Sequence, residues 1–390
     1  MLRDVLKLLP SPIRRGLSRV RQSYRLRCNL LRLKNERPFR SFDGGHVALA
    51  GVFSAGSGLA RAAELAALTL ESRGSKVTRV DLTASFGLTV HHPDERCILP
   101  ADCGSRDITD VLVVMNPDHP SLSAFDRKWL LGRTIIGHWI WELEILPRLW
   151  GKAAGSYDEI WAGTEYNLDT IRTNLLGFDR PLRLLPYAIE KDPFPAINPM
   201  RRDTVRVREG IASDTFVVGY SFSVDSNYYR KNPEDAVKAF FRAFPDVTNV
   251  LLILRSHDLG NRPLERTALE KLVGDDSRIR IYDTHHRLGI HDFYAAIDCY
   301  MSPSRAEGYG LNLVEAAQSG LPVVAGGWRI APEILALPSV HTVGFKMERV
   351  HDPQGHYAGI KSAMWSRPDV QELAAFLQMT RNRFAAAQPR

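Results

Sequence analysis

The sequence predicts an α/β protein built from two doubly wound, Rossmann-like domains. Its 390 residues are long for one domain and comfortable for two. In both halves, short apolar segments typical of buried parallel strands alternate with segments of helical periodicity. Four prolines between residues 186 and 199 separate the halves and are typical of an interdomain hinge. We therefore expect domains at residues 41–195 and 205–367, followed by a C-terminal helix over 368–390.

The first forty residues differ in charge from the rest of the chain. They carry twelve Lys or Arg residues and two acidic residues, a balance of +10, whereas the remaining chain has 39 basic and 42 acidic residues. Because leucine, isoleucine and valine are interleaved with the arginines, residues 1–40 are expected to form a basic amphipathic arm that binds an anionic membrane surface. A solvated arm, or a helix packed on the first domain, is the alternative.

Composition and spacing exclude several other classes. No apolar run approaches the ~20 residues of a membrane span, and no secretory signal pattern is present. We therefore expect a cytoplasmic protein that is peripheral on the inner face of the membrane where the arm binds. The four cysteines lack the spacing of a zinc site and are expected to be free thiols. Nucleic acid is not expected as a partner, because aromatic platforms are missing and the body is mildly acidic.

The first domain is expected to begin with a strand at residues 47–53 and a glycine-containing loop. Gly56 and Gly58 lie in that loop, but Arg61 stands where a dinucleotide fingerprint has its third glycine. Gly58 is therefore predicted to allow close approach of a phosphate or an acceptor. Further strands are predicted at residues 77–81, 110–115, 134–137, 157–163 and 183–187. The run from His138 to Glu142 follows one of them, and one of its two tryptophans is expected in the core.

The second domain is expected to open with a strand at residues 216–222. Arg230 and Lys231 follow that strand and precede a helix at residues 233–244, a place where cations suit a diphosphate. Further strands are predicted at residues 250–255, 279–282, 296–301 and 321–325. His285, His286 and His291 lack supporting ligands at metal-site spacing, so no metal site is predicted.

The most informative stretch runs from Pro303 to Glu315, between a predicted strand and a helix. Gly308 and Gly310 let the backbone approach a ligand, and the N–H groups at the start of the helix face an anion. Glu307 lies in the turn, and Glu315 lies two helical turns later near the same helix face. Two carboxylates that flank a phosphate-binding helix end predict a site for a nucleotide sugar.

The wider run EGYGLNLVEAAQSGLPVVAGG, with its two glutamates at E-x7-E spacing, resembles the donor-site signature of the family-4 retaining glycosyltransferases. These enzymes, also described as glycosyl transferases group 1, have the GT-B fold. The resemblance implies that Glu307 meets the donor sugar, Glu315 the nucleotide ribose and Lys231 the donor phosphate. It also implies that residues 368–390 cross back to the first domain.

Two positions depart from the pattern of that family. Asp225 stands where many members have an arginine, and either Arg230 or Arg255 is expected to replace that arginine. The W-x-W-E-L segment resembles one branch of the family and occupies the place where a related branch has a catalytic-site histidine. His138 is the nearest candidate for that role, and Glu142 is the alternative.

The resemblance, taken with these patterns, implies a retaining hexosyltransferase that uses a UDP- or GDP-linked sugar and a hydroxyl of a glycan or lipid-linked acceptor in bacterial surface polysaccharide or glycolipid assembly. Neither a cofactor nor a metal is expected, because no D-x-D triad occurs in the chain. A sugar-nucleotide epimerase and a non-catalytic partner subunit of the same fold are the alternatives. The predicted catalytic residues are Glu307, Lys231 and His138, and the predicted donor-binding residues are Arg230, Lys231, Gly308, Tyr309, Gly310, Leu311, Glu315 and Gly58.

Overall fold

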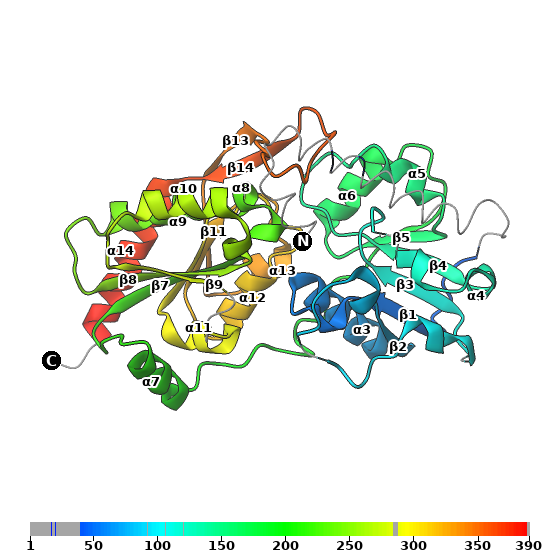
Figure 1. Ribbon diagram of the computed structural model, residues 1–390, viewed down its shortest axis with the longest axis horizontal. Helices are drawn as coiled ribbons and strands as arrows, with labels where there is room; N and C mark the ends of the chain where they lie inside the picture. Colours follow the sequence, from blue (N-terminus) through cyan, green and yellow to red (C-terminus); the bar gives the residue numbers. More distant parts are fainter. Residues whose placement is uncertain are drawn as a thin grey trace. The chain divides into compact units, whose positions relative to one another are not determined.

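The computed structural model describes residues 17, 20, 40–91, 93–105, 107–119, 121–283 and 288–387. These residues form two compact units (Figure 1). The N-terminal unit contains the described residues of Leu17–Pro193 together with Tyr357–Lys361. The C-terminal unit contains those of Phe194–His356 and Ser362–Arg390. The predicted basic arm falls almost wholly outside the described residues.

The N-terminal unit is built on a six-stranded sheet in the order β2-β1-β3-β4-β5-β6, with parallel neighbours throughout. All residues of β1, β3, β4 and β5 are buried, as expected for parallel strands covered on both faces. The strands are β1 (His46–Gly51), β2 (Lys76–Asp81), β3 (Asp110–Val114), β4 (Thr134–His138), β5 (Glu159–Ala162) and β6 (Leu182–Leu184).

Polar caps fix where the helices of this unit begin. The Ser57 hydroxyl accepts from the Ala60 backbone N–H at 3.3 Å and starts α3. The Thr164 hydroxyl accepts from the Asn167 N–H and starts α6. The helices are α3 (Gly58–Ser72), α4 (Arg127–Leu131), α5 (Trp150–Ala154) and α6 (Glu165–Asn174).

The C-terminal unit repeats this design with a sheet in the order β12-β11-β10-β7-β8-β9, again parallel throughout. A separate antiparallel hairpin pairs β13 with β14. The strands are β7 (Phe216–Ser223), β8 (Val250–His257), β9 (Ile279–Asp283), β10 (Cys299–Ser302), β11 (Val323–Gly326), β12 (Val340–Val343), β13 (Phe345–Arg349) and β14 (Met364–Pro368).

Helices cover both faces of this second sheet. Figure 1 shows α9 and α10 on one face and α11 and α12 on the other. The helices are α7 (Pro199–Arg208), α8 (Tyr228–Lys231), α9 (Pro233–Ala243), α10 (Pro263–Val273), α11 (Ile290–Ala296), α12 (Leu311–Gln318), α13 (Pro332–Leu335) and α14 (Val370–Ala387). Two doubly wound α/β units are therefore present, as the sequence predicted. None of the helices in the described part of the chain has both the length and the apolar character needed to cross a bilayer.

One expectation about the C-terminal unit requires correction. The predicted strand at residues 296–301 begins only at Cys299, because Ala296 is the last residue of α11. An apolar run alone does not separate a buried helix end from a strand. The described part of the last helix packs within this unit. Phe384 contacts Phe216 of β7, and Gln378 donates to the Ala243 carbonyl oxygen of α9.

Candidate functional site

The loops that follow β7 and β10 carry the candidate donor site. These strands are neighbours in the sheet, so their carboxyl ends lie at one edge. After β7 the chain makes a short turn and enters α8, which contains Arg230 and Lys231. After β10 it runs through residues 303–310 into α12. The fold thus brings together two segments that lie more than 70 residues apart in the sequence.

Glu307 is paired with both cations of α8. The Lys231 Nζ donates to its two carboxylate oxygens at 2.7 and 2.8 Å, and the Arg230 Nη1 lies 3.3 Å from Oε2. Burial raises the pKa of Glu307, but the positive charges of Lys231 and Arg230 outweigh burial and lower this pKa to about 2. Glu307 is therefore ionised at neutral pH and acts as a hydrogen-bond acceptor.

Arg230 is held rigidly beside that carboxylate. Its Nε and Nη2 donate to the Ser226 carbonyl oxygen at 3.1 and 2.8 Å, and its Nη1 donates to the Ala306 carbonyl oxygen at 2.7 Å. The side chain is only 8% exposed. Arg230 thus connects the turn after β7 to the loop after β10, and its positive charge is held in a fixed place between them.

A glycine-containing loop follows Glu307 and leads into α12. Gly310 has φ +103°, a left-handed conformation that favours glycine, and it caps the helix that begins at Leu311. Tyr309 Oη donates to Glu333 Oε1 of α13 at 3.0 Å, which anchors the loop. The start of α12 adds the partial positive charge of a helix N-terminus to this edge of the sheet.

Glu315 lies on α12 beside a buried tyrosine. Tyr294 Oη of α11 donates to Glu315 Oε2 at 3.1 Å. Burial and the charge of Glu315 raise the pKa of Tyr294 well above its ordinary value, so Tyr294 remains a neutral donor. Glu315 is half-buried, and its carboxylate is oriented by α11. The sequence did not indicate Tyr294, since a buried tyrosine on an apolar helix looks like an ordinary core residue.

The two arginines considered as substitutes at the Asp225 position have different surroundings. Arg255 is buried and donates to the Leu288 carbonyl oxygen and the Ser221 hydroxyl, at 3.0 and 3.1 Å. Asp225 itself forms an ion pair with Arg262, which precedes α10 and was not considered from the sequence. Arg230 is therefore the better placed of the two proposed substitutes, because it lies beside Lys231 and Glu307.

The predicted site residues of the N-terminal unit, His138 and Gly58, expose no functional side-chain group. His138, the last residue of β4, is 0% exposed and stacks on Tyr187 at a ring distance of 5.6 Å. Neither ring nitrogen has a hydrogen-bond partner within the described part of the chain, and burial lowers the pKa of His138 to about 4. Gly58, the first residue of α3, is exposed, and a Cβ there would meet nothing within 4 Å.

The W-x-W-E-L segment forms a buried aromatic cluster. Trp139 is 0% exposed and contacts Trp150 edge to face, so it belongs to the core. Trp141 is also buried, packs against Trp150 and Tyr357, and donates from Nε1 to the Ile145 carbonyl oxygen. Tyr357 Oη donates to Glu142 Oε1 at 2.5 Å. Neither tryptophan presents an open face for a sugar.

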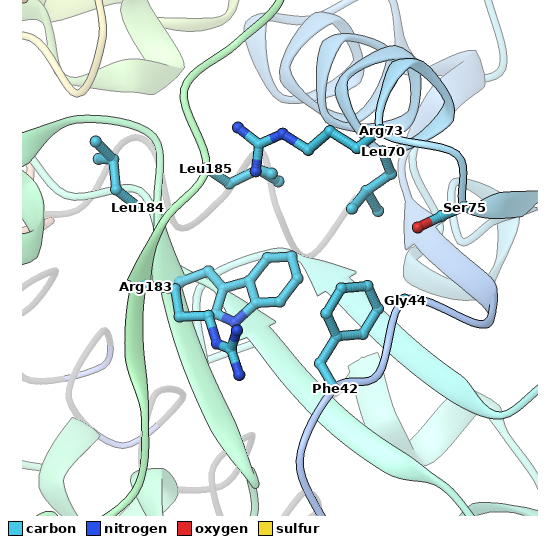
Figure 2. Close-up of a pocket in the computed structure, with 9 residues that line it drawn as sticks. Phe42, Gly44, Leu70, Arg73, Ser75, Arg183, Leu184 and Leu185 are labelled. Atoms are coloured by element: carbon cyan, nitrogen blue, oxygen red, sulfur yellow. The ribbon is translucent and has the colours of Figure 1, made fainter.

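A recess elsewhere in the N-terminal unit is distinct from these residues (Figure 2). Its volume is about 150 Å³, and Figure 2 shows Arg73 reaching across it from the end of α3. None of the predicted site residues lines this recess. Its lining residues are Phe42, Gly44, Leu70, Arg73, Ser75, Trp161, Arg183, Leu184 and Leu185. We therefore assign the candidate site to the loops after β7 and β10.

Comparison with known families places these loops in a recognised domain. Residues 226–351, which include Arg230, Lys231, Glu307 and Glu315, match the family model described as glycosyl transferases group 1. This segment is therefore similar to the group 1 glycosyltransferases. A curated relative, D-inositol 3-phosphate glycosyltransferase 1 of Catenulispora acidiphila, is 31% identical over 134 residues. The match covers 33% of this chain and 31% of the relative, so it spans less than a third of that relative's length.

Solved structures extend the similarity to most of the fold. Anabaena Alr3699/HepE, determined in complex with UDP and glucose, has a TM-score of 0.56 at 15% identity, over 87% of this chain and 93% of that chain. WaaG, a glycosyltransferase involved in lipopolysaccharide biosynthesis, has a TM-score of 0.50 at 16% identity, over 88% and 95% of the two chains. The chain therefore has the GT-B fold, as the sequence predicted. The roles assigned to single residues stay predictions.

Within the described residues, no group of three or more His, Cys, Asp or Glu side chains is arranged to hold a metal ion. His285 and His286 lie outside the described residues. Arg230, Lys231 and the start of α12 supply the positive charges of the candidate donor site.

Proposed function

We propose that this protein is a retaining glycosyltransferase that moves a hexose from a UDP- or GDP-linked sugar to a hydroxyl of a glycan or lipid-linked acceptor, in surface polysaccharide or glycolipid assembly. The observation that carries the proposal is the contact of Lys231 and Arg230 with Glu307 beside the start of α12. A nucleoside diphosphate sugar needs both charge types at that place, because its diphosphate is anionic and its sugar hydroxyls are hydrogen-bond donors.

The cations would act on the leaving group. As the bond between the sugar and the diphosphate breaks, negative charge grows on the terminal phosphate oxygens. Lys231 Nζ, the Arg230 guanidinium and the N–H groups at the start of α12 would stabilise this charge without a metal ion. Because these groups are held in place before the reaction, little reorganisation is needed when the charge develops.

Glu307 would orient the sugar. A carboxylate with a pKa of about 2 is unprotonated at neutral pH, so it is a poor general acid and a good acceptor for sugar hydroxyls. Retention would then follow from attack of the acceptor on the face that the diphosphate leaves, with the departing phosphate taking the acceptor proton. Glu315, oriented by Tyr294, would accept hydrogen bonds from the ribose hydroxyls.

The first experiment measures nucleotide binding by calorimetry. UDP, GDP, UDP-glucose and GDP-mannose are titrated into the wild type with EDTA present. The expected result is binding in one nucleotide series, unaffected by EDTA and weakened about tenfold or more by Glu315→Ala, because paired hydrogen bonds to the ribose are lost. Glu270→Ala is the matched control, since Glu270 is an exposed helical glutamate paired with Arg266. Absence of binding in both series would support the non-catalytic subunit.

The second experiment identifies the reaction. The donor series that binds is incubated with glycan and lipid-linked acceptors, and the anomeric configuration of the product is read by NMR. Transfer with retained configuration is expected. An inverted product would contradict the retaining mechanism. Release of an epimerised sugar without transfer would instead support the epimerase alternative.

A further inference from the structure

Helix α8 carries both cations of the donor site, but it is too short to maintain its own direction. It spans only Tyr228–Lys231. Isolated helices shorter than about 12 residues are marginal in water. The direction in which Arg230 and Lys231 point therefore depends on contacts from outside the helix. Several of these contacts come from the connection between β13 and β14, more than 120 residues further along the chain.

Gln354 contacts the start of α8 through both ends of its amide. Its Oε1 accepts from the Tyr228 backbone N–H at 2.5 Å, and its Nε2 donates to the Val224 carbonyl oxygen at 3.1 Å. The side chain is 5% exposed. A buried amide with both groups bonded to the backbone of one turn fixes the geometry of that turn.

Asp352 contacts the residue that caps α8. Asn227 has φ +83°, an unusual conformation for a residue other than glycine, and it is fully buried. Its Oδ1 accepts from the Arg230 N–H at 3.1 Å, and its Nδ2 donates to Asp352 Oδ1 at 2.8 Å. The same Asp352 oxygen accepts from the Gly355 N–H at 2.9 Å. Asp352 therefore holds Asn227 in the orientation that caps α8.

We propose that Asp352 and Gln354 are positioning residues that aim Arg230 and Lys231 at the diphosphate of the donor. The identity of the ligand in this proposal rests on the proposed function. The contacts of Asp352 and Gln354 with α8 are observed in the structure and do not depend on that function. Both residues lie just beyond the segment that matches the family model, which ends at residue 351. Their side-chain hydrogen bonds to Asn227, Tyr228 and Val224 fix α8 and the turn before it, so we expect them to act on the ligand through the two cations.

A ligand-free test measures hydrogen exchange of the segment 225–233 by mass spectrometry. Gln354→Ala and Asp352→Ala are expected to reduce protection in this segment, because α8 loses its outside contacts. Asp352→Asn keeps an oxygen at the Oδ1 position and is expected to restore most of the protection. Unchanged exchange in both alanine variants would overturn the proposal.

A binding test separates positioning from general stability. UDP and UMP, and GDP and GMP, are titrated into the wild type and the Gln354→Ala variant. Because the α8 cations act on the diphosphate, the variant is expected to bind the diphosphate about tenfold or more weakly, and the monophosphate about as well as the wild type. The preference for diphosphate over monophosphate is the readout that a purely structural role would not change.

Arg202→Ala is the matched control for both tests. Arg202 lies on α7 in the same unit, donates to the Ile297 carbonyl oxygen at 2.9 Å and pairs with Asp298. Its loss is expected to lower the melting temperature and leave the diphosphate preference unchanged. An equal loss of preference in Arg202→Ala and Gln354→Ala would overturn the proposal. If the wild type binds no nucleotide, the proposed function fails, and the exchange experiment alone decides whether Asp352 and Gln354 hold α8.

Discussion

At the residue scale, Glu307 is the side chain with the largest part in the proposed reaction. Its carboxylate lies within 2.8 Å of the Lys231 ammonium group and accepts from it through both oxygens. Glu307→Gln keeps the shape of the side chain but removes its charge. We expect kcat for sugar transfer to fall by about a hundredfold or more, which is the usual effect of losing one group that acts in the transition state.

The control for this variant is Glu64→Gln. Glu64 is likewise paired with an arginine, Arg79, but lies in the N-terminal unit on α3. Both variants are compared by kcat and by melting temperature. If Glu307→Gln transfers sugar at the wild-type rate, the role proposed for Glu307 is wrong. The role would also be contradicted if kcat fell equally in both variants and only in proportion to the loss of melting temperature.

His138 makes a prediction about stability and pH. Burial lowers its pKa from 6.5 to about 4, so between these pH values the unfolded chain binds more protons than the folded chain. The free energy of unfolding is therefore full above pH 6.5 and falls as the pH drops toward 4, by about 3 kcal/mol in total. His138→Phe keeps an aromatic ring against Tyr187 and should remove this loss. Urea unfolding at pH 7.5 and pH 4.5 measures the free energy of unfolding of both proteins. An equal decrease between these pH values in the wild type and in His138→Phe would contradict the prediction.

The sequence located the charged residues of the site but not the residues that hold them. Glu307, Lys231 and Arg230 stand in motifs whose spacing predicts strand ends, and the fold brings them together. Gln354 and Asp352 belong to a hairpin connection with no recognisable motif, so their contact with α8 depends on tertiary structure alone. The presence of a recognisable motif around a residue therefore decided what could be predicted.

At the scale of elements, the loop between β10 and α12 depends on one glycine conformation. A Cβ on Gly310 would lie 3.3 Å from Leu313 Cδ1 and 3.4 Å from Ile334 Cδ1, at φ +103°. Gly310→Ala should therefore cost about 1–2 kcal/mol of stability. Because the substitution also displaces the start of α12, it should weaken binding of the donor nucleotide. Calorimetry and thermal unfolding measure the two effects.

Gly320 provides the control at the other end of α12. It has φ +88°, but a Cβ there would meet nothing within 4 Å. Gly320→Ala should therefore show a comparable loss of stability with an unchanged affinity for nucleotide. If both variants lose affinity equally, the shape of the Gly310 loop has no special part in binding.

The boundaries of helices and strands show what apolar patterns do not predict. The parallel strands other than β12 (Val340–Val343) were predicted, because a buried strand is a short apolar run between polar ends. The run from Ala295 to Met301 was misread at its start, since it contains the end of α11 followed directly by β10. Both elements are buried, so hydrophobicity alone does not mark the junction.

At the scale of the whole molecule, the charge of the chain is divided unevenly. Residues 1–40 carry a balance of +10, and the rest of the chain is mildly acidic. We therefore predict that residues 1–40 bind anionic lipid, a role separate from the chemistry proposed for the two α/β units. A basic residue near an anionic surface contributes about 1 kcal/mol, so several of them suffice for reversible attachment.

Deletion of residues 1–39 tests this division of roles. Arg40, which donates to the Gly132 carbonyl oxygen, and Phe42, which packs against Trp161, remain in place, so the N-terminal unit keeps its described contacts. The full chain should sediment with phosphatidylglycerol vesicles and not with phosphatidylcholine vesicles, and salt should weaken this binding because it screens the charges. The deleted chain should stay in the supernatant and bind nucleotide with unchanged affinity. Equal sedimentation of the two chains with vesicles would show that the folded units, and not residues 1–39, make the membrane contact. Loss of nucleotide binding would show that residues 1–39 contribute to folding or to the site.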